Sequence, residues 1–268
     1  MAGNTKILRN RIKSVTSTLQ MTKAMGLVAS SKIRKANQAM IRSREYAASF
    51  EKTISLLTSD ESAKESPFMA KRDTGRTRLV VIAGDRGLAG GYNANVFRLC
   101  QTMPDAEFIP IGKRACERFS SAILSSEHFT FSDAKKISAI LCADFAEGKY
   151  DRLGIVYSHY HSVMEQEAKI RWILPLEKGE GQKTPPVLEP DFRTVLDHAV
   201  KEYVSGMITS LVRESFACEV AARRNAMDSA EKNAKQMIDD LTLAYNRARQ
   251  GAITQEITEI VAGSDNTR

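Results

Sequence analysis

A seven-residue repeat of apolar side chains near the N-terminus constrains the fold more than any other feature of this chain. Apolar or small residues recur at alternating spacings of four and three, at Leu8, Ile12, Val15, Leu19, Thr22, Gly26, Ala29, Ile33, Ala36, Met40, Ser43, Ala47, Phe50, Ile54 and Leu57. A repeat held this long is typical of a left-handed coiled coil. As one helix, residues 4–58 would span roughly 80 Å, and a second helix must cover so narrow an apolar stripe.

The C-terminal part of the chain offers the matching helix. No proline follows Pro190, and residues 207–250 contain neither Gly nor Pro. The expected seam is Met227, Ala230, Ala234, Met237, Leu241, Ala244, Ala248 and Gly251, in which small residues allow close helix packing. A helix pair inside a globular core is the alternative, but helices of roughly 60 Å exceed the diameter of a small domain. We therefore predict a projecting pair.

The positive charge of the chain is concentrated in the first of these helices. Residues 1–58 hold 11 Lys and Arg and two acids, and no acid precedes Glu45, whereas the formal net charge of all 268 residues is +7. A basic N-terminus of this kind fits a transit peptide, a nucleic-acid arm, a membrane-surface helix or a helix that meets an acidic partner. The strict repeat favours the last of these, since the others need no such register.

The middle of the chain changes to the pattern of an α/β domain. Expected strands are 78–83, 108–111, 153–158 and 169–174, and expected helices are 94–103, 113–121 and 133–147. This alternation indicates βαβ units on a mostly parallel sheet, with an antiparallel edge as an option. We expect four parts: an N-terminal helix at 1–58, a linker at 59–76, an α/β domain at 77–190 and a C-terminal helix at 191–268.

Motifs for bond-making chemistry are missing from the sequence. The loop GDRGLAGG at 84–91 follows a strand and precedes a helix, but it matches neither GxGxxG nor the Walker motif, so a turn exposed for a protein partner is the preferred interpretation. The four cysteines form no CxxC pair and are read as reduced thiols. His159 and His161 would share one face of a strand, where solvent exposure is favoured over a metal site. We expect no cofactor.

Three groups of residues stand out as motifs. The first is Arg11–Val15 with Met21–Met25 and Val28–Lys32, and the second is the loop Gly84–Asn93. The third comprises Arg223–Met227, Asn233-Ala234, Tyr245–Gln250 and Ile253–Glu256. Together these groups resemble the γ subunit family of F-type ATP synthases. The groups occur in the family's order from residue 4 to residue 264, which makes the resemblance specific.

The resemblance implies a non-catalytic shaft. The fold class expected is α plus α/β, with long N- and C-terminal helices in a left-handed coiled coil and a central Rossmann-like α/β domain. Such a subunit rotates inside the α3β3 ring, meets the ε subunit and the c-subunit ring, and couples proton or sodium flow to ATP synthesis or hydrolysis at the β subunits. It binds neither nucleotide nor nucleic acid and reaches the membrane only through the complex.

The resemblance also assigns partner contacts. Those expected near the shaft tip are Arg249, Gln250, Thr254 and Glu256, beside an apolar face of Ile253, Ile257, Ile260 and Val261. Lys23 and Met25 would face an acidic lever of a β subunit. Arg86, Tyr92 and Asn93 would contact the ring side. The rival interpretations are a basic helical protein that binds nucleic acid or membrane surfaces, and an α/β nucleotide enzyme.

Departures from the family pattern are local. Gly26 stands where a long residue is usual, Ala89 replaces a common Cys, and the tail reads Gly263-Ser264-Asp265 in place of Gly-Ala-Ala. The cysteine insert of the chloroplast type is missing. Because the pattern starts within a few residues of Met1, we expect a bacterial protein without a transit peptide, peripheral on the cytoplasmic face of the plasma membrane.

Overall fold

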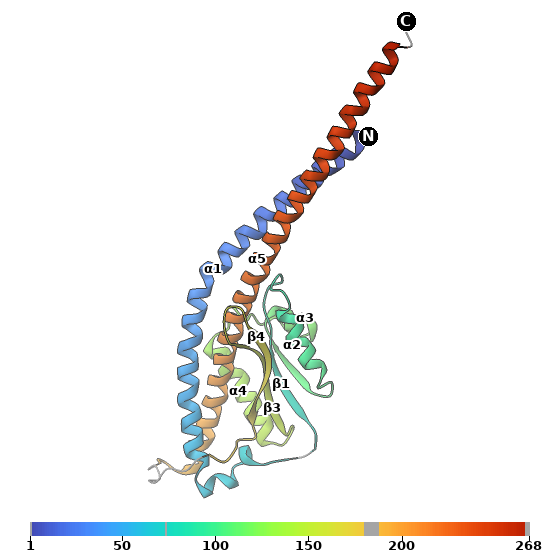
Figure 1. The fold of residues 1–268 in the computed structure, drawn as a ribbon. Coiled ribbons are helices and arrows are strands. Elements are labelled where there is room, and N and C mark those ends of the chain that lie inside the picture. The colour runs from blue at the N-terminus through green and yellow to red at the C-terminus, as the bar shows by residue number, and fades with distance from the viewer. Residues whose placement is uncertain (1, 73, 180–187, 266–268) are drawn as a thin grey trace. The chain divides into compact units, whose positions relative to one another are not determined.

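Two long helices begin and end the chain, as the sequence predicts. A computed structural model describes residues 2–72, 74–179 and 188–265, with side chains described for residues 5–72, 74–179 and 188–260. Helix α1 is Ala2–Thr58 and helix α5 is Phe192–Asp265 (Figure 1). The chain forms two compact units, and each contains a segment of both helices. One unit comprises residues up to Ala29 together with those from Arg224 onward, and the other is Ser30–Arg223.

The seven-residue repeat of α1 is confirmed as a buried stripe. All fifteen predicted positions are buried or half-buried, whereas the residues between them are mostly exposed. In the unit of the two chain ends, α1 packs against α5 near Gly26. A methyl group placed on Gly26 would lie 3.5 Å from Cβ of Met227, and the side chains of Ala29, Met227 and Ala234 are buried. The left-handed supercoil stays a prediction.

The predicted seam of α5 is right at five of its eight positions. Met227, Ala230, Ala234, Leu241 and Ala248 are buried or half-buried as expected, but Met237, Ala244 and Gly251 are exposed. Their places are taken by the next residue along the chain, Ile238, Tyr245 and Ala252, each of which is half-buried. Apolar residues that repeat every 3.5 residues lie alternately three and four positions apart. At every second seam position, therefore, either of two neighbouring residues can face the other helix. Burying Tyr245 in place of Ala244 removes more apolar surface from water. Ile238 and Ala252 lie seven residues before and after Tyr245 and therefore share its face of the helix.

The unit Ser30–Arg223 contains a four-stranded mixed sheet in the order β2-β1-β3-β4. Its strands are β1 (Thr77–Ile82), β2 (Glu107–Ile111), β3 (Arg152–Tyr160) and β4 (Gln166–Leu174). Strand β1 pairs in parallel with β2 and β3, and β4 pairs antiparallel with β3. The connecting helices are α2 (Tyr92–Gln101), α3 (Lys113–Arg118) and α4 (Phe131–Ala146). The mostly parallel sheet with an antiparallel edge is therefore confirmed.

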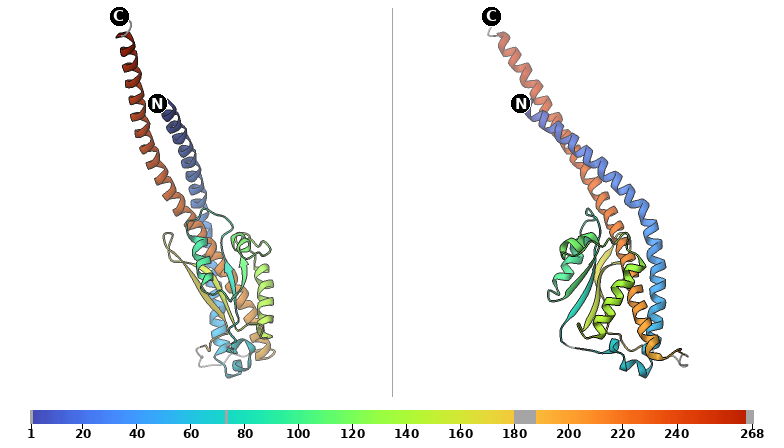
Figure 2. Two further views of the ribbon diagram at one scale, coloured as in Figure 1. Left: turned by 90° about the vertical axis from the view of Figure 1, so that its right-hand side faces the viewer. Right: turned by 180° about the vertical axis from the view of Figure 1, so that it is seen from behind.

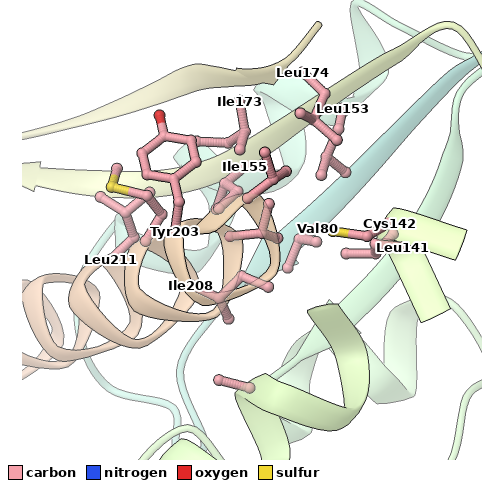
Figure 3. Close-up of a cluster of buried hydrophobic side chains, with 14 of the residues drawn as sticks. Val80, Leu141, Cys142, Leu153, Ile155, Ile173, Leu174, Tyr203, Ile208 and Leu211 are labelled. Atoms are coloured by element: carbon pink, nitrogen blue, oxygen red, sulfur yellow. The ribbon is translucent and has the colours of Figure 1, made fainter. Parts of the chain in front are cut away.

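Helices cover both faces of this sheet (Figure 2). On one face Val80 and Ile155 pack with Leu141 of α4 and Ile208 of α5 (Figure 3). On the other face the alternate residues of β1 pack against α2. A strand covered on both sides must be apolar throughout, and residues 79–82 of β1 are fully buried. The core of this unit thus holds the first turns of α5 directly against the sheet.

The segment predicted as a linker after α1 is packed in part. It forms two short 3₁₀ helices, Glu61–Glu65 and Pro67–Met69. Phe68 is buried and stacks on Phe145 with ring centroids 6.1 Å apart, and its carbonyl oxygen accepts a hydrogen bond from the N–H of Leu176 at 2.8 Å. The composition of residues 59–76 does not indicate this packing, because the one buried Phe lies among polar residues. The end of the predicted α/β domain, which runs to residue 190, falls partly on residues 180–187, outside the described residues.

Candidate partner-contact sites

The nine predicted contact residues fall in the two compact units. Lys23, Met25, Arg249, Gln250, Thr254 and Glu256 belong to the unit of the chain ends, and Arg86, Tyr92 and Asn93 belong to the α/β unit. Lys23 is exposed and Met25 is half-buried. The charge of Lys23 helps to lower the pKa of Glu231, although the hydrogen bond from Lys235 is the larger cause. A basic side chain on α1 thus lies near an acid of α5 within this unit.

The last described turns of α5 are almost fully exposed, and from Ile253 to Ile260 every side chain is exposed. Arg249, Gln250, Thr254 and Glu256 all have exposed side chains. Three isoleucines share this segment, with exposed fractions of 46% at Ile253, 57% at Ile257 and 72% at Ile260. Their spacing places them on one face of the helix. An exposed apolar row of this kind is typical of an interaction surface. The fourth member of the predicted face, Val261, has its side chain outside the described part.

The loop after β1 is shaped by two of its predicted contact residues. Asn93 Oδ1 accepts a hydrogen bond from the N–H of Gly84 at 2.9 Å, which closes the loop. The hydroxyl of Tyr92, only 5% exposed, donates to the carbonyl oxygen of Ser215 on α5 at 3.0 Å. Arg86 and Leu88 instead point outward. The side chain of Arg86 is 63% exposed, and Leu88 as a whole residue is also 63% exposed. Arg86 and Leu88 are therefore the accessible side chains of this loop, whereas Tyr92 and Asn93 hold its shape.

Asp85 ties this loop to two neighbouring segments. Its carboxylate accepts hydrogen bonds from the N–H groups of Lys113, Ser126 and Glu127, each at 2.9 Å, and from the hydroxyl of Ser125 at 2.5 Å. Burial alone would raise the pKa of Asp85, but these donors bring that pKa below its ordinary value. Asp85 is thus an ionised hub on which three parts of the chain converge.

Glu219 and Arg223 of α5 lie against the same loop. Arg223 Nη2 donates to Oε1 of Glu219 at 2.5 Å and to the carbonyl oxygens of Arg86 and Gly87 at 3.3 and 3.2 Å. The carboxylate of Glu219 is packed so closely on Gly84 that a side chain there would meet it at 2.7 Å. Burial raises the pKa of Glu219, although Arg223 opposes that rise.

The chemistry of this loop differs from that of a phosphate site. In a phosphate-binding loop, free N–H groups and the start of a helix point at the anion. Here the N–H of Lys113 at the start of α3 already donates to Asp85, and the carboxylate of Glu219 lies against Gly84. An approaching phosphate would meet negative charge. Among the described residues, no group of three His, Cys, Asp or Glu side chains is placed to hold a metal ion.

The whole chain matches a known family. A family model described as ATP synthase matches residues 4–266. The ATP synthase gamma chain of Ruminococcus albus is 42% identical over 98% of this chain and 99% of its own length. The chain belongs to the ATP synthase gamma-chain family. A second gamma chain, described as sodium ion specific and found in Acetobacterium woodii, is 36% identical over 99% of both chains.

Solved structures share the gamma-chain fold. One is the mitochondrial ATP synthase of Euglena gracilis, a structure of OSCP, F1 and the c-ring, with a TM-score of 0.71 and 20% identity over 100% of this chain and 95% of that chain. Another is the central stalk and c-ring of the Tetrahymena thermophila enzyme, with a TM-score of 0.62 and 22% identity over 78% of this chain and 99% of that chain. The expected fold of two long helices and a central mixed sheet is confirmed.

Several residues that organise the gamma-chain loop were missed by sequence reasoning. The sequence motifs include Asp85 and Arg223 without indicating their contacts, and Glu219 lies in none of the motifs. One signal for Glu219 was present in the sequence. Glu219 is the one charged residue in the apolar run FACEVAA at 216–222, which predicts a buried acid, and a buried acid requires a partner. The identity of that partner, four residues further along and in contact with a loop more than 130 residues away, needed the structure.

Proposed function

We propose that this chain is the central shaft of an F1Fo ATP synthase. It rotates inside the α3β3 ring and couples ion flow through the membrane rotor to ATP synthesis or hydrolysis at the β subunits. The observation that carries the proposal is the near full-length match to gamma chains, together with a fold in which both chain ends form long paired helices. The rival interpretation as a basic nucleic-acid- or membrane-surface-binding protein is not supported, since relatives over the same length are gamma chains.

The proposed contacts with the ring use the exposed end of α5 and one side of α1. Arg249, Gln250, Thr254 and Glu256 bind loops of the α and β subunits, and Ile253, Ile257 and Ile260 turn against an apolar sleeve. Support comes from the exposure of all these side chains. Lys23 and Met25 meet an acidic lever of β. The absence of acids before Glu45 supports this pairing, since cations are drawn toward an acidic partner.

The α/β unit is proposed to meet the other rotor and ring components. Arg86, held in an exposed position by Tyr92 and Asn93, contacts the ring side, and the unit binds the ε subunit and the c-subunit ring. The chain itself performs no catalysis and binds no nucleotide. The two carboxylates at the glycine-rich loop support this statement, because they disfavour a phosphate there.

We further propose that the complex lies on the cytoplasmic face of a bacterial plasma membrane. Within the described residues no helix combines the length and hydropathy needed to cross a membrane. In this proposal the chain reaches the membrane through its partners. Either protons or sodium ions serve as the coupling ion, and one relative carries the description sodium ion specific.

Reconstitution tests the proposal. Adding this chain to purified α and β subunits should produce a complex that co-elutes on size exclusion and hydrolyses ATP cooperatively, with inhibition by azide. The double substitution Arg249→Ala with Glu256→Ala should slow hydrolysis by the assembled complex while the circular dichroism of the free chain is unchanged. The matched control is Arg98→Ala with Asp105→Ala, which removes one exposed charge of each sign from the α/β unit.

Two results would contradict the proposal. The first is a chain that stays monomeric and leaves the activity of α and β unchanged. The second is strong salt-dependent binding of the free chain to duplex DNA or anionic vesicles, which would favour the rival class. Slower hydrolysis in the Arg98 and Asp105 control alone would place the contacts elsewhere.

A further inference from the structure

One face of α5 changes its mode of packing just before the α/β unit ends. Up to Val212, α5 contributes to the main apolar core of the unit. Further along, three residues spaced four apart make polar contacts with the opposing segments. Ser215 accepts through its carbonyl oxygen from Tyr92, while Glu219 and Arg223 contact the loop after β1. Successive turns of α5 thus contact the loop after β1 and Tyr92, the first residue of α2. The last of these contacts is made by Arg223, at the end of the unit Ser30–Arg223.

The same loop is attached to a second segment and through it to α1. Asp85 accepts from the N–H groups of Ser126 and Glu127. The side chain of Glu127 then forms ion pairs with Lys32 of α1 at 2.6 Å and with Arg86 at 3.4 Å. A continuous path of polar contacts therefore runs from α5, through residues 84–87 and 125–127, to α1. It reaches α1 at Lys32, two residues inside the other unit boundary at Ser30.

Polar contacts restrain rotation in a way that apolar contacts do not. Apolar packing resists large rotations of a helix, because they would expose its buried face, but over small angles burial of apolar surface has little directional preference. Hydrogen bonds weaken steeply when donor and acceptor are misaligned. The planar guanidinium of Arg223, with a side chain 13% exposed, holds two carbonyl oxygens and a carboxylate in one fixed arrangement. Turning α5 would break these bonds in a site that water enters poorly.

We propose that Lys32, Asp85, Arg86, Glu127, Glu219 and Arg223 form a clamp that fixes the rotational angle of α5 and α1 against the α/β sheet. This inference rests on the proposed function, because a shaft must pass torque between its base and its helices. The clamp is the joint at which torque applied to the α/β unit enters both helices. Arg223 and Asp85 are its central positioning residues.

The test compares angular fluctuations of assembled complexes. The α3β3 ring is fixed to a surface, ATP is withheld, and a bead is attached to the α/β unit through Met164→Cys, a site that is 79% exposed. The clamp variant is Arg223→Gln with Asp85→Asn. The control is Arg118→Gln with Asp105→Asn, which makes the same chemical changes at exposed sites of the same unit. The variance of the bead angle should rise by about twofold in the clamp variant and stay at the wild-type value in the control.

Hydrolysis by the same complexes separates stiffness from catalysis. At saturating ATP the hydrolysis rate of the clamp variant should stay within about twofold of wild type, because neither residue belongs to the proposed ring contacts. If the double variant does not fold, Arg223→Lys carries the test. It keeps the positive charge beside Glu219 but loses the planar fork, so an intermediate rise in variance is expected.

The outcomes distinguish the two proposals. Equal variance in the wild-type, clamp and control complexes, or equal variance in wild-type and Arg223→Lys complexes if only that variant folds, would overturn the clamp and leave the shaft function in place. A wild-type chain that does not assemble with α and β would overturn the shaft function, and the role of the clamp with it.

Discussion

The guanidinium of Arg44 on α1 binds the carboxylate of Glu214 on α5 with two hydrogen bonds. Nη2 lies 2.7 Å from Oε1, and Nε lies 3.2 Å from Oε2. The same carboxylate accepts from the N–H of Tyr160 at 3.0 Å and lies 2.7 Å from Nδ1 of His159. The hydrogen bond to Glu214 raises the pKa of Arg44. One buried acid thus joins both long helices to the end of β3.

Removing Arg44 should destabilise the α/β unit strongly. Arg44→Met leaves Glu214, whose side chain is 4% exposed, as a buried charge without its cation, and we expect a loss of about 3 kcal/mol in the free energy of unfolding. Urea unfolding followed by circular dichroism measures it. Arg42→Met, an exposed site on the same helix, is the control. The double variant with Glu214→Leu should recover part of the loss, and an unchanged Arg44→Met variant would show that the pair is unimportant for stability.

Asp85→Asn should lower stability and change its pH dependence. An amide oxygen accepts fewer hydrogen bonds than the carboxylate, so a loss of about 1–3 kcal/mol is expected near neutral pH. The folded pKa of Asp85 lies below its unfolded value of about 3.9. The stability contributed by ionised Asp85 is therefore present above about pH 4 and is lost as the pH falls through the folded pKa.

Urea unfolding of the Asp85→Asn variant between pH 2 and pH 7 measures both effects. The variant should lack this part of the acid-side decline, whereas Asp105→Asn at an exposed site should keep it. A pH profile identical to that of wild type would show that Asp85 does not act as a charged hub.

Gly112 is expected to tolerate no side chain. Its φ is +97°, and a Cβ there would lie 2.0 Å from the carbonyl oxygen of Ala83. Gly112→Ala should cost about 3 kcal/mol or more. Gly75 also has a positive φ, +79°, but nothing lies within 4 Å of its Cβ position, so Gly75→Ala should cost only about 1 kcal/mol. Similar melting temperatures for the two variants would argue against the close approach at Gly112.

Gly26 should accept a methyl group despite its buried place on α1. The nearest atom to its Cβ position is Cβ of Met227 at 3.5 Å, an ordinary contact distance. Gly26→Ala should therefore stabilise the helix by up to about 1 kcal/mol, as should Gly251→Ala at an open site. Gly26→Ile should lose that gain through overpacking. Thermal melting of the full chain checks the order, and a destabilised Gly26→Ala variant would indicate tighter helix packing than the structure has.

The four thiols should react slowly in the folded protein. All four cysteines are buried, and burial raises the pKa of Cys100 and of Cys142 to about 11 and shifts that of Cys218 in the same direction. A rise from 9.0 to about 11 lowers the thiolate fraction at pH 8 by about 100-fold. Titration with an aromatic disulfide reagent should give rapid reaction only in urea. A fast-reacting thiol without denaturant would reveal an opening of the core.

Local periodicity was sufficient to predict the elements of this fold. The repeat from Leu8 to Leu57 placed every buried position of that stripe, and the apolar runs placed all four strands within a few residues. Both signals arise between neighbours along the chain, where side-chain direction follows directly from helix or strand geometry. The three motifs in the family's order identified the family for the same reason, because each motif is a short run of neighbouring residues.

Only the tertiary structure decided which of two neighbouring residues faces inward and which distant groups pair. Tyr245 rather than Ala244 lines the α5 seam, and Tyr92 holds the loop from inside. The contacts of Arg223 with the loop and of Glu214 with Arg44 join residues more than 130 positions apart. The sequence alone does not show whether a charged side chain is solvated or paired, because the tertiary packing determines which group lies beside it.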